Sequence, residues 1–205
     1  MPYPVGVTSV SPTTGRPRDA DLDERILAAT RDLLAERGYA GTTIAAVARA
    51  AGTTRPSVYL RWPSQEELVT SAIAAMPLPL PLPVTADVHG DLLAELRHFH
   101  AAVTRPHGVN LVGTVLAEEH STPALLAEFR RRLLRPRRTR VERILRRGVA
   151  AGVLRADLDV DVATNVVIGS FYARYLAASH VPATWPARVL ATVWPGWLRP
   201  GRTER

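Results

Sequence analysis

The residues best suited to binding chemistry form a short polar run, Thr54, Arg55, Pro56 and Ser57, between two apolar segments. An arginine guanidinium donates two parallel hydrogen bonds that match the major-groove edge of guanine, and threonine and serine hydroxyls bind phosphates or bases. The first turn of a helix also presents backbone N–H groups that attract phosphate. If this run opens a helix, its side chains are placed to contact double-stranded DNA.

Residues 43–62, TIAAVARAAGTTRPSVYLRW, contain the elements that would hold this run. Two short helices, one ending at Gly52 and one beginning at Thr54, are separated by a tight turn, as in a helix-turn-helix. Ala48 and Ala51 are small enough to let the two helices cross closely. The alternative is that short amphipathic helices around a glycine merely pack together, and the polar first turn of the second helix favours DNA binding.

Two further helices are expected around this pair. Asp21 and Ser64 are each followed by a glutamate three residues later, which is the pattern of a capping box at the start of a helix. The first of these helices carries an apolar stripe and is expected to end at Gly38, a residue suited to a C-terminal cap. The sequence therefore predicts a DNA-binding domain over residues 19–62 and a connecting helix over 63–76.

Proline-rich segments suggest where the chain divides. Residues 1–18 are rich in proline, glycine, serine and threonine and are expected to form a flexible arm. Residues 77–83, PLPLPLP, exclude a helix and favour a stiff extended spacer, with a ligand for SH3-like domains as the alternative. Beyond the spacer, residues 84–205 are expected to form a ligand-binding and dimerisation domain.

Apolar residues recur at helical spacing throughout this body. Helices are expected over about 87–105, 108–119, 122–151, 159–179 and 185–198. Pro136 must kink or split the third of these helices, because it lacks a backbone N–H and its ring crowds the preceding turn. The fourth is apolar on nearly every side, which places it in a core or against a second subunit. The predicted fold class is all-α, with a helix-turn-helix head, a helical bundle and about nine helices.

The net charge of +7 and pI of about 10.8 favour a polyanionic partner. Most of the excess lies in residues 130–147, which hold ten arginines and one acid, Glu142. We interpret this run as the solvated outer face of a long helix whose apolar residues face inward. Those apolar residues are Phe129, Leu133, Val141, Ile144 and Leu145.

Composition excludes several classes of protein. With no cysteine, the chain has no disulfide, catalytic thiol or cysteine-ligated zinc. No apolar run is long enough to span a membrane, and the N-terminus lacks the pattern of a secretory signal. We therefore expect a cytoplasmic protein that makes no membrane contact.

No catalytic, metal or cofactor site is predicted. His98 and His100 stand two residues apart on an expected helix, so they point in different directions and are poor joint metal ligands. No zinc-peptidase, nucleophile-elbow, phosphate-loop or dinucleotide-binding pattern is present. Two alternatives come from other classes. Steady turnover without DNA binding would favour an all-α enzyme, and failure to retard any DNA fragment at low salt would favour a helical protein-interaction module.

The N-terminal motifs resemble the TetR family of transcriptional regulators. The resemblance is carried by ILAATRDLLAERGYAGTTIAAVARAAG and TTRPSVYLRWPSQEELV, within about residues 20–76, and the GVLRADLDVDVA stretch of the body is similar to one TetR subgroup. By this resemblance, Thr43 and Tyr59 match phosphate-contacting residues of the family, and residues 54–57 match its groove-facing turn.

One position departs from the family pattern. Gln65 stands where the family commonly has a lysine at the start of the fourth helix, so one charged phosphate contact is lost and the salt dependence of DNA binding should be weaker. We hypothesise that Arg61, or Arg16 or Arg18 of the arm, replaces that contact.

The resemblance also implies a homodimer formed through the last two helices, an effector pocket in the body and repression relieved by the effector. The two recognition helices would lie in successive major grooves, about 34–36 Å apart, on a near-palindromic operator. We expect an apolar or aromatic effector, held by residues that could equally form an ordinary core. They are Phe99, Val103, Val115, Phe129, Phe171, Tyr172 and Tyr175.

Overall fold

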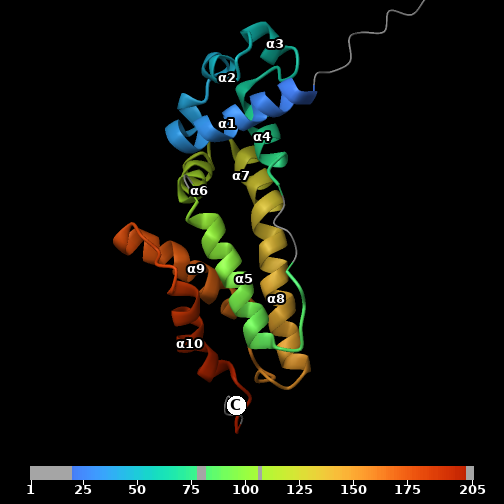
Figure 1. The fold of residues 1–205 in the computed structure, drawn as a ribbon, viewed down its shortest axis with the longest axis vertical. Coiled ribbons are helices and arrows are strands. Elements are labelled where there is room, and N and C mark those ends of the chain that lie inside the picture. Colours follow the sequence, from blue (N-terminus) through green and yellow to red (C-terminus); the bar gives the residue numbers. More distant parts are fainter. Residues whose placement is uncertain (1–19, 78–81, 106–107, 202–205) are drawn as a thin grey trace, which may run out of the picture.

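The structure, a computed structural model, describes residues 20–77, 82–105 and 108–201, and these residues are organised as helices (Figure 1). No strand occurs within these ranges, where the only β-type pairing is an isolated bridge between Leu154 and Leu198. The predicted arm, residues 1–18, and the centre of the predicted spacer, residues 78–81, lie outside the described residues. None of the described helices is long and apolar enough to cross a membrane.

Four helices occupy the N-terminal end of the molecule. They are α1 (Ala20–Gly41), α2 (Ile44–Ala50), α3 (Arg55–Tyr59) and α4 (Gln65–Ala74). The helical path of α1 is interrupted at Gly38, which has a positive φ of 68°. Glycine adopts this conformation readily, in agreement with the glycine cap expected at this position. Ser64 caps α4, as predicted, by accepting a hydrogen bond from the backbone N–H of Glu67, and its hydroxyl donates to the Glu67 carboxylate at 3.3 Å.

The first four helices share one apolar core. Ile26 of α1, Val47 of α2, Val58 of α3 and Leu68 of α4 are fully buried in a single cluster. A second cluster joins the other face of α4 to α1, α6 and α7, and includes the buried Val69. Helix α4 therefore contributes to the head core and to the contact between the head and the body, which is how it connects the two.

The body contains the remaining helices. They are α5 (Val88–Val103), α6 (Gly108–Ala117), α7 (Pro123–Phe129), the π-helical turn η1 (Arg130–Leu134), α8 (Arg135–Ala150), α9 (Val160–Ala178) and α10 (Trp185–Trp197). With α7, η1 and α8 taken as one continuous tract, the described residues form nine helices, as predicted. Helix α5 packs along α8, and α10 packs on α5 and α9 (Figure 1).

The long tract from Pro123 to Ala150 changes its geometry close to Pro136. In η1 the backbone N–H of Arg135 donates to the carbonyl of Arg130, a wider turn than that of an α-helix. A proline cannot donate to the preceding turn and crowds its carbonyl, so the wider turn directly before Pro136 accommodates the ring. At the start of the tract, Thr122 occupies the N-cap position, but its side chain makes no capping hydrogen bond.

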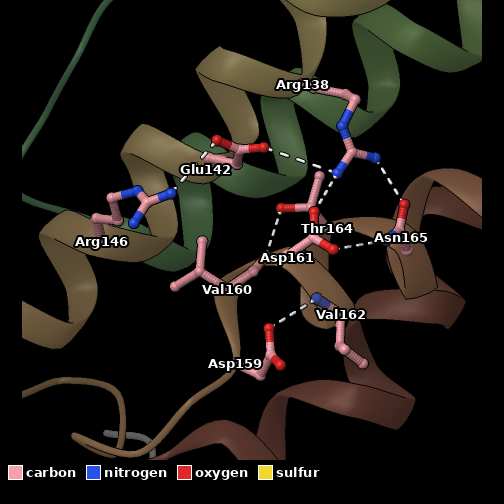
Figure 2. Close-up of polar contacts among 9 residues, drawn as sticks. All are labelled: Arg138, Glu142, Arg146, Asp159, Val160, Asp161, Val162, Thr164 and Asn165. Carbon is pink, nitrogen blue, oxygen red and sulfur yellow. Dashed lines mark hydrogen bonds and ion pairs between the residues drawn. The ribbon is translucent and has the colours of Figure 1, made fainter.

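The arginine-rich run is not simply a solvated face, so that interpretation is wrong for several of its members. Arg138 contacts Asp161 and the side-chain oxygen of Asn165 on α9, both at 2.6 Å (Figure 2). Arg140 binds the buried Glu95 of α5 at 2.8 Å, and Arg147 pairs with Asp91. These arginines join α8 to its neighbours.

Candidate nucleic-acid interface and ligand cavity

Two threonine hydroxyls cap the helices of the helix-turn-helix. The Thr54 oxygen accepts a hydrogen bond from the backbone N–H of Ser57 at 3.3 Å, and the Thr43 oxygen accepts one from the N–H of Ala46 at 3.2 Å. A hydroxyl that accepts from its own helix keeps its proton to donate outward. Both caps are exposed, so each hydroxyl can donate to a phosphate beside its helix.

The first turn of α3 faces solvent. Thr54, Arg55 and Pro56 are exposed, and Ser57 is half-buried. Val58, which is fully buried, anchors the helix in the head core. The same helix therefore buries one side chain and presents its polar first turn outward.

The end of α3 carries two exposed side chains, one predicted and one not. Tyr59 is 52% exposed, and Leu60, which sequence reasoning did not select, is 84% exposed. A leucine that meets no core is available for apolar contact with thymine methyl groups. Because Val58 fixes the buried side of the helix, the outward position of Leu60 follows from helical spacing.

Arg61 and Gln65 are turned toward the protein. Arg61 forms an ion pair with Asp23 of α1, and one of its terminal nitrogens donates to the carbonyl of Ser57 at 2.9 Å. The amide of Gln65 donates to the carbonyl of Tyr39 at 2.6 Å. Both side chains brace the helix-turn-helix on α1. The hypothesis that Arg61 replaces a phosphate contact stays a prediction. To make that contact, Arg61 would have to share its guanidinium with Asp23 and Ser57 or leave them.

A cavity of about 630 Å³ lies between the head and the body. Helix α1 and the segment that follows α4, at Met76 and Pro77, form one side of it, and α5, α6, the α7–η1–α8 tract and α9 contribute the rest. The lining combines apolar side chains with a few charged and polar ones. The latter are Arg31, Asp32, His98, Arg105, Arg137 and Tyr172.

The predicted ligand-binding residues are divided between this cavity and the surrounding cores. Val103, Phe129 and Tyr172 line the cavity. Phe99 and Phe171 lie in the body core with their ring centroids 4.8 Å apart. The remaining two are Val115, buried in the cluster beside α4, and Tyr175, half-buried against the body core.

Sequence reasoning missed Arg137, which lines the cavity and is only 9% exposed. Its guanidinium carbon lies 4.7 Å from the centroid of the Phe99 ring. Burial lowers the pKa of Arg137, and the nearby Glu95 opposes that shift. A signal was present in the sequence, because Leu133, Arg137 and Val141 are four residues apart and continue one inward-facing stripe.

Tyr172 lies against the same aromatic group. Its ring centroid is 5.9 Å from that of Phe99 in an edge-to-face arrangement. Burial raises the pKa of the Tyr172 hydroxyl, and Arg137 opposes that rise, so the group is a neutral hydrogen-bond donor at neutral pH.

The buried acids of the body each have basic partners. Asp91 accepts hydrogen bonds from the backbone N–H and hydroxyl of Thr85 at 2.9 and 2.8 Å and pairs with Arg147. Burial would raise the pKa of Asp91, but these partners hold it below its ordinary value. Among the described residues, no group of three potential ligands could hold a metal ion.

An exposed polar recognition helix, a capped helix-turn-helix and a helical body with a cavity define a DNA-binding regulator with a ligand-binding domain. The chain belongs to the TetR family. Residues 26–72 match the family described as bacterial regulatory proteins, tetR family, and residues 82–193 match the Tetracyclin repressor-like, C-terminal domain. This confirms the resemblance seen in the sequence.

Known relatives of the chain are regulators of transcription. The HTH-type transcriptional regulator YdeS of Bacillus subtilis (strain 168) is 28% identical over 170 residues, covering 79% of this chain and 82% of YdeS. AqdR of Rhodococcus erythropolis is 26% identical over 186 residues, covering 87% and 86%. The solved TetR family transcription regulator SCO0332 is 28% identical, with a TM-score of 0.60, and the match covers 86% of this chain and 98% of that one.

Proposed function

We propose that this protein is a dimeric transcriptional repressor that binds a near-palindromic operator and releases it when a small molecule enters the cavity. The observation that carries the proposal is the outward-facing first turn of α3, together with a cavity that α1 and the segment just beyond α4 share with the body. Arg55 would contact a base edge, and the hydroxyls of Thr43, Thr54 and Tyr59 would contact phosphates. The protein would act in the cytoplasm, without enzymatic activity.

Ligand response requires that the effector bind two conformations with different affinity. Asp32 of α1 and Met76, just beyond α4, both line the cavity, so a ligand there touches the helices that hold the head. The Nε of Arg132, in η1, donates to the carbonyl of Met76 at 3.0 Å. We propose that a ligand shifts α1 and the end of α4, and that this hydrogen bond transmits part of the shift.

The dimer would form through α9 and α10. Helix α9 leaves Val162, Val166 and Leu176 exposed, and Leu176 is 84% exposed. Large apolar side chains spread along one helix are typical of a subunit interface. A dimer with two-fold symmetry would present two copies of α3 to one operator.

Solved proteins with this fold hold chemically different ligands. FadR of Bacillus subtilis was solved with stearoyl-CoA (TM-score 0.65, 17% identity), and a regulator of Saccharomonospora viridis was solved with choline (TM-score 0.69, 17% identity). One of these ligands is an anion and the other a cation, so the fold does not determine effector chemistry. For this chain, the effector has to be inferred from its own cavity lining.

A mobility-shift assay on the DNA upstream of the protein's own gene tests the proposed function. The wild-type protein should retard that fragment in the presence of excess unrelated DNA, and Arg55→Ala should need about tenfold to a hundredfold more protein to do so. Arg143→Ala is the matched control, because Arg143 is an exposed body residue and its loss changes the net charge equally. Failure of the wild-type protein to bind any fragment at low salt would contradict the proposal.

A further inference from the structure

The cavity contains a buried cation that lacks an acidic partner. Arg137 makes no hydrogen bond or ion pair with any residue that the structure describes, and its Nε is buried without a partner. The nearby carboxylate, Glu95, is 2% exposed and accepts two hydrogen bonds from Arg140, at 3.0 and 2.8 Å. Two arginines therefore share one acid, and Arg137 is the one left without direct contact.

Burying an unpaired charge is unfavourable, so the position of Arg137 calls for an explanation. Stacking over the Phe99 ring offsets part of the cost and holds the guanidinium in one plane. A guanidinium fixed in this way can donate two parallel hydrogen bonds to a carboxylate, which is the geometry that arginine matches best.

The groups around Arg137 are also suited to an anion. The described residues that line the cavity include three arginines and one aspartate, Asp32, which is exposed. Arg31 already pairs with Glu24 at 2.6 Å, whereas Arg105 and Arg137 form no ion pair with an acid that the structure describes. The Tyr172 hydroxyl and the buried, unpartnered Nδ1 of His98 can each donate a hydrogen bond into the same space.

We propose that the effector is an organic carboxylate whose charged group binds Arg137, with Tyr172 and His98 as additional donors. The apolar remainder of the molecule would lie among Val103, Leu111 and Phe129, which line the same cavity. This inference rests on the proposed effector site and replaces the expectation of a purely apolar or aromatic ligand with an amphipathic anion. The same excess of positive charge would repel a quaternary ammonium ligand, so the cationic probe should bind more weakly than the carboxylates.

Paired probes that differ in one functional group test this assignment. Calorimetric titration would compare decanoate with decanamide and naphthoate with naphthamide, and decyltrimethylammonium would serve as the cationic probe. At least one carboxylate should bind the wild-type protein about tenfold or more tightly than its amide, because hydrogen bonds to an ionised partner are the stronger ones. Equal affinity for acid and amide in both pairs, or no carboxylate binding up to about 1 mM, would overturn the proposal.

Variants separate binding by Arg137 from a structural role. Arg137→Gln should abolish the preference for the acid and leave amide affinity unchanged, Arg137→Lys should keep part of the preference, and Tyr172→Phe should weaken only acid binding. Arg143→Gln, on the exposed face of α8, is the control with the same loss of charge. Arg137→Met should melt at or above the wild-type temperature, because it removes a buried unpaired charge. A variant at position 137 that folds and retains the full preference would refute the assignment.

The DNA-binding assay on the same preparations separates this proposal from the one on which it rests. If the wild-type protein retards its upstream DNA but shows no preference for carboxylates, the effector assignment fails and the regulatory function stands. If it retards no DNA, the regulatory function fails whatever the calorimetry shows.

Discussion

Arg55 in the head and Arg140 in the body have the same side chain in opposite surroundings. Arg55 is exposed on the first turn of α3, with no ion pair to any described residue. Arg140 is largely buried against Glu95 and joins α8 to α5. The body holds most of the positive charge, yet much of that charge is neutralised internally. The positive charge that is available to DNA therefore depends on which arginines lack partners within the protein. The number of arginines alone does not show how much charge is available.

The largest effect should come from removing the internal partner of Glu95. Arg140→Ala is expected to lower the free energy of unfolding by about 3 kcal/mol, because it leaves a buried carboxylate with only the more distant Arg137. Urea unfolding measures the change. Replacing both residues, as Arg140→Met with Glu95→Leu, should recover most of the loss, and Arg130→Ala on the exposed surface should change stability by less than about 0.5 kcal/mol. A similar small effect for Arg140→Ala would remove the contrast between the two regions.

The head should show the reverse behaviour. Arg55→Ala is expected to weaken specific DNA binding by about tenfold to a hundredfold, because one base-edge contact is lost, and to leave the melting temperature unchanged. Fluorescence anisotropy with a labelled upstream fragment measures the affinity, and Arg143→Ala supplies the control. Equal losses of affinity in the two variants would mean that bulk charge, and not α3, determines binding.

A smaller effect is expected on the stability of the folded protein when the pH is lowered. Because its partners hold the pKa of Asp91 below the unfolded value of about 3.9, the ionised form stabilises the folded state above that pH. That contribution is lost as the pH falls through the lowered folded-state pKa. Urea midpoints measured from about pH 6 to about pH 3 should fall more steeply in the wild-type protein than in Asp91→Asn. Parallel curves would show that Asp91 does not contribute to the acid sensitivity of the body.

The smallest effect concerns Gln65, which is positioned inward at the edge of the head. Gln65→Lys should make the plot of log affinity against log salt concentration steeper by about one unit, through one additional phosphate contact. It should also cost about 1 kcal/mol of stability, because the hydrogen bond to the Tyr39 carbonyl is lost. An unchanged salt slope would indicate that position 65 does not reach the DNA backbone.

Sequence reasoning succeeded where the determining contacts are local. The helix starts predicted at Thr54 and Ser64 depend on hydroxyls that accept from backbone N–H groups three residues away, so residue type and spacing indicated them. The cap predicted at Asp21 is wrong, because α1 begins at Ala20 and Asp21 lies within its first turn. Arg61 was interpreted as a DNA-facing candidate, and Gln65 as a position that loses a phosphate contact, but the partners of these two side chains within the protein lie 38 and 26 residues away. Only the packing of α3 and α4 on α1 brings those partners close, so the pattern along the chain could not reveal them.

The cavity was harder to predict for the same reason. Apolar residues of a body helix look alike in sequence whether they line a space or fill a core, and of the seven expected residues three line the cavity. Arg137 was hidden among neighbouring arginines, although its position in the stripe of Leu133 and Val141 placed it inward. A polar side chain within an apolar stripe indicated the cavity better than the apolar residues did.

The π-helical turn η1 determines which side chains of α8 face the body core, because it rotates α8 about the helix axis relative to α7. One residue of an α-helix advances the chain by about 100°, and a turn closed over five residues inserts one residue relative to an α-helix. Before η1, the tract packs on α4 and α6, and after it, on α5 and α9. Deleting one residue of η1 would rotate Arg137 away from Phe99 and turn a neighbouring side chain inward. The rotation that this single turn introduces thus allows one continuous helical tract to pack on α4 and α6 at one end and on α5 and α9 at the other.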